Sequence, residues 1–196
     1  MTTKESTRPL FRTRQLTIVG MLASITVILG LTGYGFIPLP MAKATVMHIP
    51  VIIGAVLEGP SVGFMVGLLF GLFSIFQNIM APNILSFAFL NPLVSVLPRV
   101  LIGLTAYYCY KALPVRNEAI RIGVGAALGS LTNTVGVLGM IYLLYAADFA
   151  AARNIDPATV LAVVSGIALT NGLPEAIISA MIAVPVVVMI KKARRT

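Results

Sequence analysis

Polar side chains inside otherwise apolar stretches are the residues of this sequence that could do chemistry. They recur at four-residue spacing, which places each row on one face of a helix. The rows are Asn91, Ser95 and Arg99; Asn171, Glu175 and Ser179; and Asn133, which ends a row begun by Gly125 and Gly129. Because polar groups are costly in apolar surroundings, they tend to face a cavity or one another. One arginine among amides and hydroxyls suits an anion that also carries hydrogen-bonding groups.

Arg99 is the permanent cation of these rows. Its planar guanidinium can hold a carboxylate through two parallel hydrogen bonds. That carboxylate could belong to a ligand or to Glu175, and both hold if Glu175 restrains Arg99 between binding events. His48 is either a packing residue or a ligand contact. No cluster of His, Cys and acidic residues accompanies it, so we expect no metal site.

Two motifs, one for nucleotide binding and one for metal-dependent catalysis, are missing from the sequence. It contains no G-x-x-x-x-G-K-[ST] loop and no H-E-x-x-H. We therefore expect no enzymatic activity and no cofactor in this chain. If ATP drives its function, partner chains bind the ATP and the magnesium.

The composition predicts that the polar rows lie inside a membrane. Hydrophobic residues make up 58% of the chain and charged residues 10%, against about 25% charged in ordinary globular domains. Apolar stretches long enough to cross a bilayer recur between Leu16 and Ile190. We expect an all-α polytopic membrane protein with six transmembrane helices, and no cleaved signal peptide. The expected spans are 16–31, 45–57, 62–80, 90–110, 119–145 and 171–190.

The positive charges indicate how these spans are oriented. The net charge is +8, and Lys and Arg gather before the first span, between the fourth and fifth, and after the last. With six spans these clusters share one side, which predicts cytoplasmic termini. Residues 1–15 and 191–196 are then basic cytoplasmic tails around a transmembrane domain at 16–190, and no nucleic acid is expected as a partner. Arg99, Asn133 and Asn171 fall in the outer half of the membrane.

Glycine and proline mark the irregular parts of the chain. The outer segment 33–40 holds two of each, which predicts a shaped loop instead of a helix. The stretch 157–190 is too long for one perpendicular span. We expect it to divide at 171–174 into an outer helix, 157–169, and the sixth span, with one long kinked helix as the alternative. A glycine every four residues from Gly59 to Gly71 predicts close helix packing, within the chain or against another subunit.

Several segments resemble one family of membrane proteins. They are the turn 33–40, the stretch 44–54 around His48, the turn 58–63, Ser86-Phe87, and the segments 98–104 and 170–175. Together they extend over nearly the whole chain except its tails. They are similar to the substrate-binding (S) subunits of energy-coupling factor (ECF) vitamin transporters. The segment His-Ile-Pro-Val-Ile-Ile-Gly, 48–54, most resembles the pantothenate-specific branch.

The resemblance implies a subunit of the bacterial plasma membrane that captures pantothenate at the outer face and delivers it inward by reorienting. Its implied partners are a transmembrane coupling subunit (T) and two ATP-binding cassette ATPases (A and A′). The implied substrate-binding residues are Arg99, which takes the carboxylate, and Asn133, Asn171, Asn91, His48, Glu175 and Ser95. The implied lid is the loop that holds Tyr34, Phe36, Pro38 and Pro40. The implied contact with the coupling subunit is Gly20, Ala23 and Ser24 on the first span.

Three alternatives stay open at this point. The chain could be an S subunit for another vitamin or precursor, such as a pyridoxine-type compound, hydroxymethylpyrimidine, folate or riboflavin. It could be a self-sufficient secondary carrier or channel, although its polar rows gather toward one side and do not form a continuous pore. An intramembrane enzyme could recruit Glu175, His48 and Arg99, but no nucleophile–base pair has a recognisable spacing.

Overall fold

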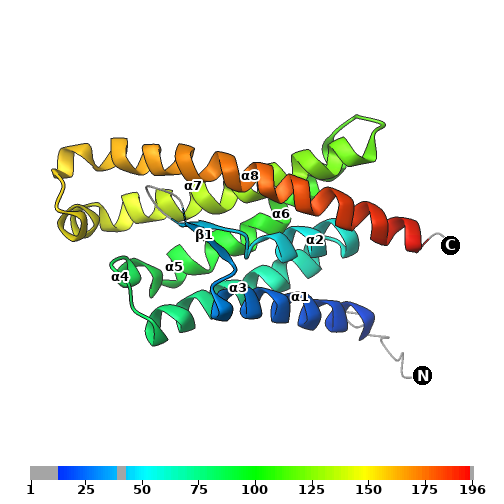
Figure 1. Ribbon diagram of the computed structural model, residues 1–196, viewed down its shortest axis with the longest axis horizontal. Helices are drawn as coiled ribbons and strands as arrows, with labels where there is room; N and C mark the ends of the chain where they lie inside the picture. Colours follow the sequence, from blue (N-terminus) through cyan, green and yellow to red (C-terminus); the bar gives the residue numbers. More distant parts are fainter. Residues whose placement is uncertain (1–12, 39–42, 195–196) are drawn as a thin grey trace, which may run out of the picture.

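The structure, a computed structural model that describes residues 13–38 and 43–194, is a helical bundle with one short hairpin (Figure 1). Its long helices are α1 (Thr13–Thr32), α3 (Pro60–Met80), α6 (Leu97–Ala112), α7 (Glu118–Arg153) and α8 (Val160–Ala193). Its short elements are α2 (Ile49–Glu58), α4 (Ser86–Phe89), α5 (Pro92–Ser95) and the 3-10 turn η1 (Pro157–Thr159). Strands β1 (Phe36–Pro38) and β2 (Lys43–Thr45) pair antiparallel.

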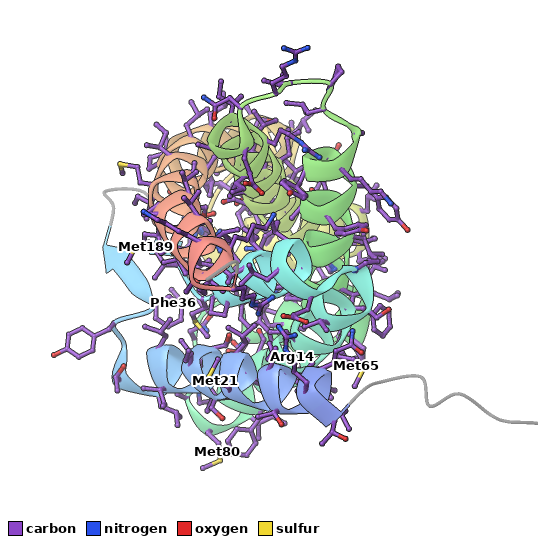
Figure 2. The ribbon with its side chains drawn as sticks, turned by 90° about the vertical axis from the view of Figure 1, so that its right-hand side faces the viewer. Arg14, Met21, Phe36, Met65, Met80 and Met189 are labelled. Atoms are coloured by element: carbon purple, nitrogen blue, oxygen red, sulfur yellow. The ribbon has the colours of Figure 1, made fainter. Side chains whose placement is uncertain are left out.

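Five helical stretches are long and apolar enough to cross a membrane, with α5 and α6 forming one stretch from Pro92 to Ala112. Large apolar side chains cover much of their outside, as expected of a surface that faces lipid. Met80, for example, projects from the periphery of the bundle (Figure 2). The sixth apolar helix, α2, has 10 residues and is almost entirely buried. The all-α prediction is confirmed, and five of the six expected spans have the length of a transmembrane helix.

The predicted division of residues 157–190 is wrong. Residues 160–193 form one continuous helix, α8, which contains both Pro174 and Pro185. A proline inside a helix loses one backbone hydrogen bond, but α8 packs along α7, where Gly172 lies against Leu131 and Thr134. This packing keeps the helix together across Asn171. Pro157 begins only the short turn η1, which Asp156 caps.

Helix α7 is longer than the span that the sequence predicts. It continues past Tyr145, where non-helical dihedral angles (φ −139°, ψ 28°) kink it, and ends at Arg153. Asn154 follows in the left-handed conformation (φ 52°). The extension carries α7 and α8 together beyond the rest of the bundle, on the left of Figure 1.

The expected shaped loop contains strand pairing that the sequence analysis did not predict. Phe36 pairs with Thr45, and Val46 donates a backbone hydrogen bond to Gly35 over 2.9 Å. The hairpin lies across the front of the bundle in Figure 1. Pro40 lies outside the described residues, as do residues 1–12 and 195–196 of the predicted tails.

The glycine ladder packs within the chain. A methyl group on Gly63 would meet Gly103 of α6, and one on Gly67 would meet the backbone oxygen of Arg99. One on Gly71 would meet Val96, between α5 and α6. Glycine at these positions therefore lets α3 touch the backbone that carries Arg99.

Ion pairs join the helices at the end of the bundle where α1 begins and α8 ends, which we call the terminal end (Figure 1). Glu58 of α2 pairs with Arg14, over 3.1 Å, and with Arg194. Figure 2 shows Arg14 reaching inward from α1. Lys191 lies 2.7 Å from Glu118 at the same end. These contacts fix the ends of four helices to one another, opposite the polar rows.

Candidate functional site

A cavity of about 580 Å³ occupies the half of the bundle away from the terminal end. Its volume is in the range of small-molecule sites, roughly 300–1,000 Å³. Helices α3, α6, α7 and α8 form its sides, the segment 81–89 forms one edge, and the hairpin contributes Phe36 and Thr45. The predicted site residues that line it are Arg99, Asn133, Asn171, Glu175 and Phe36.

Arg99 enters the cavity from the first turn of α6. Val96 separates α5 from α6, so the helix is interrupted just before Arg99. Nη1 of Arg99 donates to the carbonyl oxygen of Val94 over 2.7 Å. The guanidinium lies 5.6 Å from the ring centre of Phe70 and 5.4 Å from that of Phe89. These contacts fix the plane of the guanidinium. Its Nε, on a residue only 6% exposed, has no hydrogen-bond partner among the described residues.

No carboxylate of the described residues lies within 4.0 Å of the Arg99 guanidinium. The internal ion pair with Glu175 that the sequence left open is therefore not formed. A buried cation without a carboxylate is costly, and an anionic ligand would offset that cost. The geometry favours the ligand alternative for Arg99.

Asn133 of α7 and Asn171 of α8 line the cavity beside Arg99. They are 3% and 5% exposed, and within the described part of the chain the carboxamide oxygen of each lacks a hydrogen-bond partner. Buried polar atoms are nearly always paired, so unpaired ones in one cavity indicate groups that meet a ligand or water. Two acceptors and one cationic donor can thus bind a molecule that carries both a carboxylate and O–H or N–H groups.

Glu175 lines the cavity, but both of its oxygens are occupied by protein groups. Oε1 accepts the backbone N–H of Thr45 over 2.6 Å, and Oε2 accepts the hydroxyl of Thr134. The carboxylate thereby fastens β2 to α8 and α7. In the structure it holds the hairpin at the cavity, and its direct contact with a substrate stays a prediction.

The structure does not bring Asn91, His48 or Ser95 to the cavity wall. Asn91 caps α5 and donates to the hydroxyl of Tyr145 over 3.0 Å. His48 is fully buried, with Nε2 2.8 Å from the hydroxyl of Ser179. Ser95 donates to the carbonyl oxygen of Phe89. In this arrangement the three residues hold wall elements in place, and their direct contact with a substrate stays a prediction.

The predicted lid residues differ in their positions. Phe36 lines the cavity, whereas Tyr34 is 82% exposed and is not part of the wall. Pro38 ends β1, and Pro40 lies outside the described residues. The described part of the hairpin thus covers the cavity through Phe36 and Thr45.

Sequence reasoning missed several residues of the wall. Phe70 and Phe89 flank Arg99, but nothing distinguishes them in sequence from other apolar residues. Gln77 and Asn78 stand out as amides in an apolar span, so the rule that selected Asn133 could have found them. Asn78 accepts hydrogen bonds from Asn83 and Ser86, which shapes the edge of the cavity.

The residues predicted to meet the coupling subunit divide between two faces of α1. Gly20 and Ser24 are exposed, and a methyl group on Gly20 would meet no atom of residues 13–38 or 43–194 within 4 Å. Ala23 is buried in the bundle. Small residues on the open face leave room for a closely packed partner helix.

Residues 14–187 match the family described as the substrate-specific component of ECF transporters. The chain belongs to this family. Members of the family bind the substrate of a transporter and do not convert it, so this S component is not an enzyme. It resides in the cell membrane and works with the other components of an ECF module.

Two relatives of this S component carry more specific names. It is 30% identical over 171 residues to the pantothenic acid transporter PanT of Lactococcus lactis subsp. cremoris, an alignment that covers 80% of this chain and 82% of the relative. It is 35% identical over 113 residues to the pantothenate transporter PanT of Leuconostoc mesenteroides, with 53% and 55% of the two chains covered. These relatives agree with the branch that residues 48–54 resemble.

Proposed function

We propose that this S component binds pantothenate in the cavity around Arg99 and delivers it across the membrane. One observation carries the proposal. Among the residues that the structure describes, the buried guanidinium of Arg99 has no carboxylate partner, and it shares a cavity with amide oxygens of Asn133 and Asn171 that have no hydrogen-bond partner there. Pantothenate carries one carboxylate, one amide and two hydroxyls, which match these groups in kind. The names of the two relatives support the same ligand.

The groups of the cavity suit the two ends of this molecule. Arg99 takes the carboxylate, and its free Nε adds a charged donor. Asn133 and Asn171 accept the hydroxyl and amide hydrogens. Phe36 and Phe70 cover the aliphatic part. The hairpin excludes water when it is closed, which strengthens every polar contact beneath it.

The proposed topology has six membrane helices, with the short α2 as the second. The terminal end carries Arg14, Arg116, Arg121 and Lys191. By the positive-inside rule it faces the cytoplasm. The cavity then opens on the extracellular side, where a vitamin is captured.

The energy for transport comes from partner chains in this proposal. A transmembrane coupling subunit (T) docks on the open face of α1, and two ATPases (A and A′) bind the ATP and magnesium. The S component itself carries no cofactor. Reorientation against the coupling subunit then brings the cavity to the cytoplasmic side.

A binding screen tests the ligand. The purified full-length chain in lipid nanodiscs is titrated by calorimetry with pantothenate, pyridoxine, hydroxymethylpyrimidine, folate and riboflavin. We expect one pantothenate per chain and at least a hundredfold weaker binding of the other compounds. Tight binding of another vitamin, with none of pantothenate, contradicts the proposed ligand. Pantothenate uptake into liposomes that contain this chain alone would instead support a secondary carrier.

A further inference from the structure

The cavity continues far beyond Arg99 along α7. The residues of α7 that line it are Asn133, Thr134, Val137, Leu138, Ile141, Phe149 and Arg153. At 1.5 Å per residue the helix from the first to the last of these is about 30 Å long, somewhat less after the kink at Tyr145. A small vitamin held at Arg99 fills only the inner part. We call the outer part, which extends from the ligand site to Arg153, the passage.

A second cation, Arg153, stands at the outer end of this passage. It lies in the last turn of α7, is half-buried, and lines the cavity. Its guanidinium lies 5.4 Å from the ring centre of Phe149. No carboxylate of the described residues comes within 4.0 Å of it. Arg153 therefore has a charge that is not neutralised by a partner, directed to the same cavity as Arg99.

None of the described acidic residues near Arg153 pairs with its guanidinium. Asp148 is exposed and is not part of the cavity wall. Asp156 caps η1, where its Oδ1 accepts the backbone N–H of Ala158 over 2.8 Å. Glu175, the acidic residue of the described cavity wall, lies with the inner groups and is held by Thr45 and Thr134. A negatively charged molecule thus meets Arg153 first and Arg99 last.

We propose that Arg153 is an outer capture site for the carboxylate of the substrate, which it attracts into the passage before Arg99 binds it. The inference rests on the proposed function in that the substrate is anionic. A charge at the rim of a site raises the association rate and its dependence on salt, and it has little effect on dissociation. The other role open to an arginine in the last helical turn is stabilisation of the helix end, which would alter folding stability instead.

The experiment compares association rates at two salt concentrations. Full-length protein in uncharged phosphatidylcholine nanodiscs is mixed rapidly with tritiated pantothenate, and bound label is followed over time. The variants are Arg153→Gln, Arg153→Lys and the control Arg116→Gln, which removes the same charge from the exposed loop between α6 and α7 at the terminal end. Dissociation is measured in the same samples by a chase with unlabelled pantothenate.

We expect Arg153→Gln to slow association roughly two- to fivefold at low ionic strength, with dissociation unchanged. The difference should vanish at 1 M salt, where the Debye length is about 3 Å. Arg153→Lys and Arg116→Gln should behave like the unaltered protein. Equal association rates at low salt would overturn the proposal, and so would a slowing that persists at 1 M salt or extends to Arg153→Lys. If the unaltered protein binds no pantothenate, the proposed function itself fails.

Discussion

The backbone N–H of Thr45 donates to Oε1 of Glu175 over 2.6 Å, between residues 130 positions apart in the sequence. The other oxygen of the same carboxylate accepts the hydroxyl of Thr134. Glu175 is only 4% exposed, so the hairpin, α7 and α8 meet at one buried side chain. Because a charged acceptor makes a stronger hydrogen bond than a neutral one, this carboxylate holds the cover of the cavity in place.

Replacing Glu175 with Gln should loosen that cover. The amide keeps the shape but has a single acceptor oxygen, so it can accept the N–H of Thr45 only if its own N–H donates to the hydroxyl of Thr134. Both bonds are then neutral, a loss of about 1 kcal/mol, which corresponds to roughly fivefold faster dissociation of pantothenate. Association should change little, because the cavity itself is intact. A chase of bound tritiated pantothenate measures the rate. The matched control is Glu58→Gln, which alters a largely buried carboxylate at the terminal end. Equal dissociation rates for both variants would show that Glu175 does not hold the hairpin over the bound ligand.

Replacing Arg99 with Met should remove most of the affinity for pantothenate. Met keeps an apolar stem between Phe70 and Phe89 but loses the charge that faces the carboxylate. Loss of one member of a buried charge pair costs about 2–5 kcal/mol. Calorimetry measures the change, and circular dichroism confirms that the variant is folded. The affinity of Arg99→Lys for pantothenate should lie between that of the unaltered protein and that of Arg99→Met, because an ammonium keeps the charge but lacks the planar fork. Unchanged affinity in a folded Arg99→Met protein would place the carboxylate elsewhere.

Single substitutions of Asn133 and Asn171 with Ala should each weaken binding by about 0.5–1.5 kcal/mol, the net contribution of one neutral hydrogen bond. The ligand-free protein should keep its thermal stability, because neither amide oxygen has a hydrogen-bond partner among the described residues to lose. Asn91→Ala is the matched control. It should leave the affinity unchanged but lower the melting temperature, since Asn91 caps α5 and binds Tyr145. Weaker binding of pantothenate by Asn91→Ala, with an unchanged melting temperature, would make Asn91 a ligand contact, as the sequence suggested.

The sequence predicts which polar residues matter better than it predicts what each one touches. A polar group in an apolar span is costly unless it faces a cavity or another polar group. For this reason one cavity is lined by Arg99, Asn133, Asn171 and Glu175. Four-residue spacing gives the face of a helix but not the neighbouring element. The spacing therefore could not reveal that Ser95 is bound to the backbone near Phe89.

Long-range packing accounts for the other differences. The continuity of α8 across Asn171 and Pro174 depends on α7, which lies alongside it, and no local signal records that contact. The contact of Glu175 with Thr45 likewise requires the whole bundle to assemble. Helix existence is local and could be predicted, whereas helix ends and side-chain partners depend on the tertiary structure.

Replacing Gly20 with Leu should abolish transport without affecting binding. Gly20 and Ser24 lie on the open face of α1, where a Cβ on Gly20 would meet no atom of the described residues within 4 Å. A leucine side chain there would hold a closely packed partner helix away. Pantothenate affinity and melting temperature should stay as in the unaltered protein. Uptake by proteoliposomes that contain the complete ECF module and ATP should fall to background. Normal uptake with Gly20→Leu would place the coupling contact on another face.

Gly67→Ala supplies the contrasting control, because its added methyl group points inward. It would meet the backbone oxygen of Arg99 and the Cα of Val100, and overpacking of this kind costs about 1–3 kcal/mol. Stability should fall, and pantothenate affinity with it, since the first turn of α6 must shift to make room. The two glycines thus separate two surfaces of the S component: a substitution inside damages the site, whereas one outside damages only its coupling to the transporter.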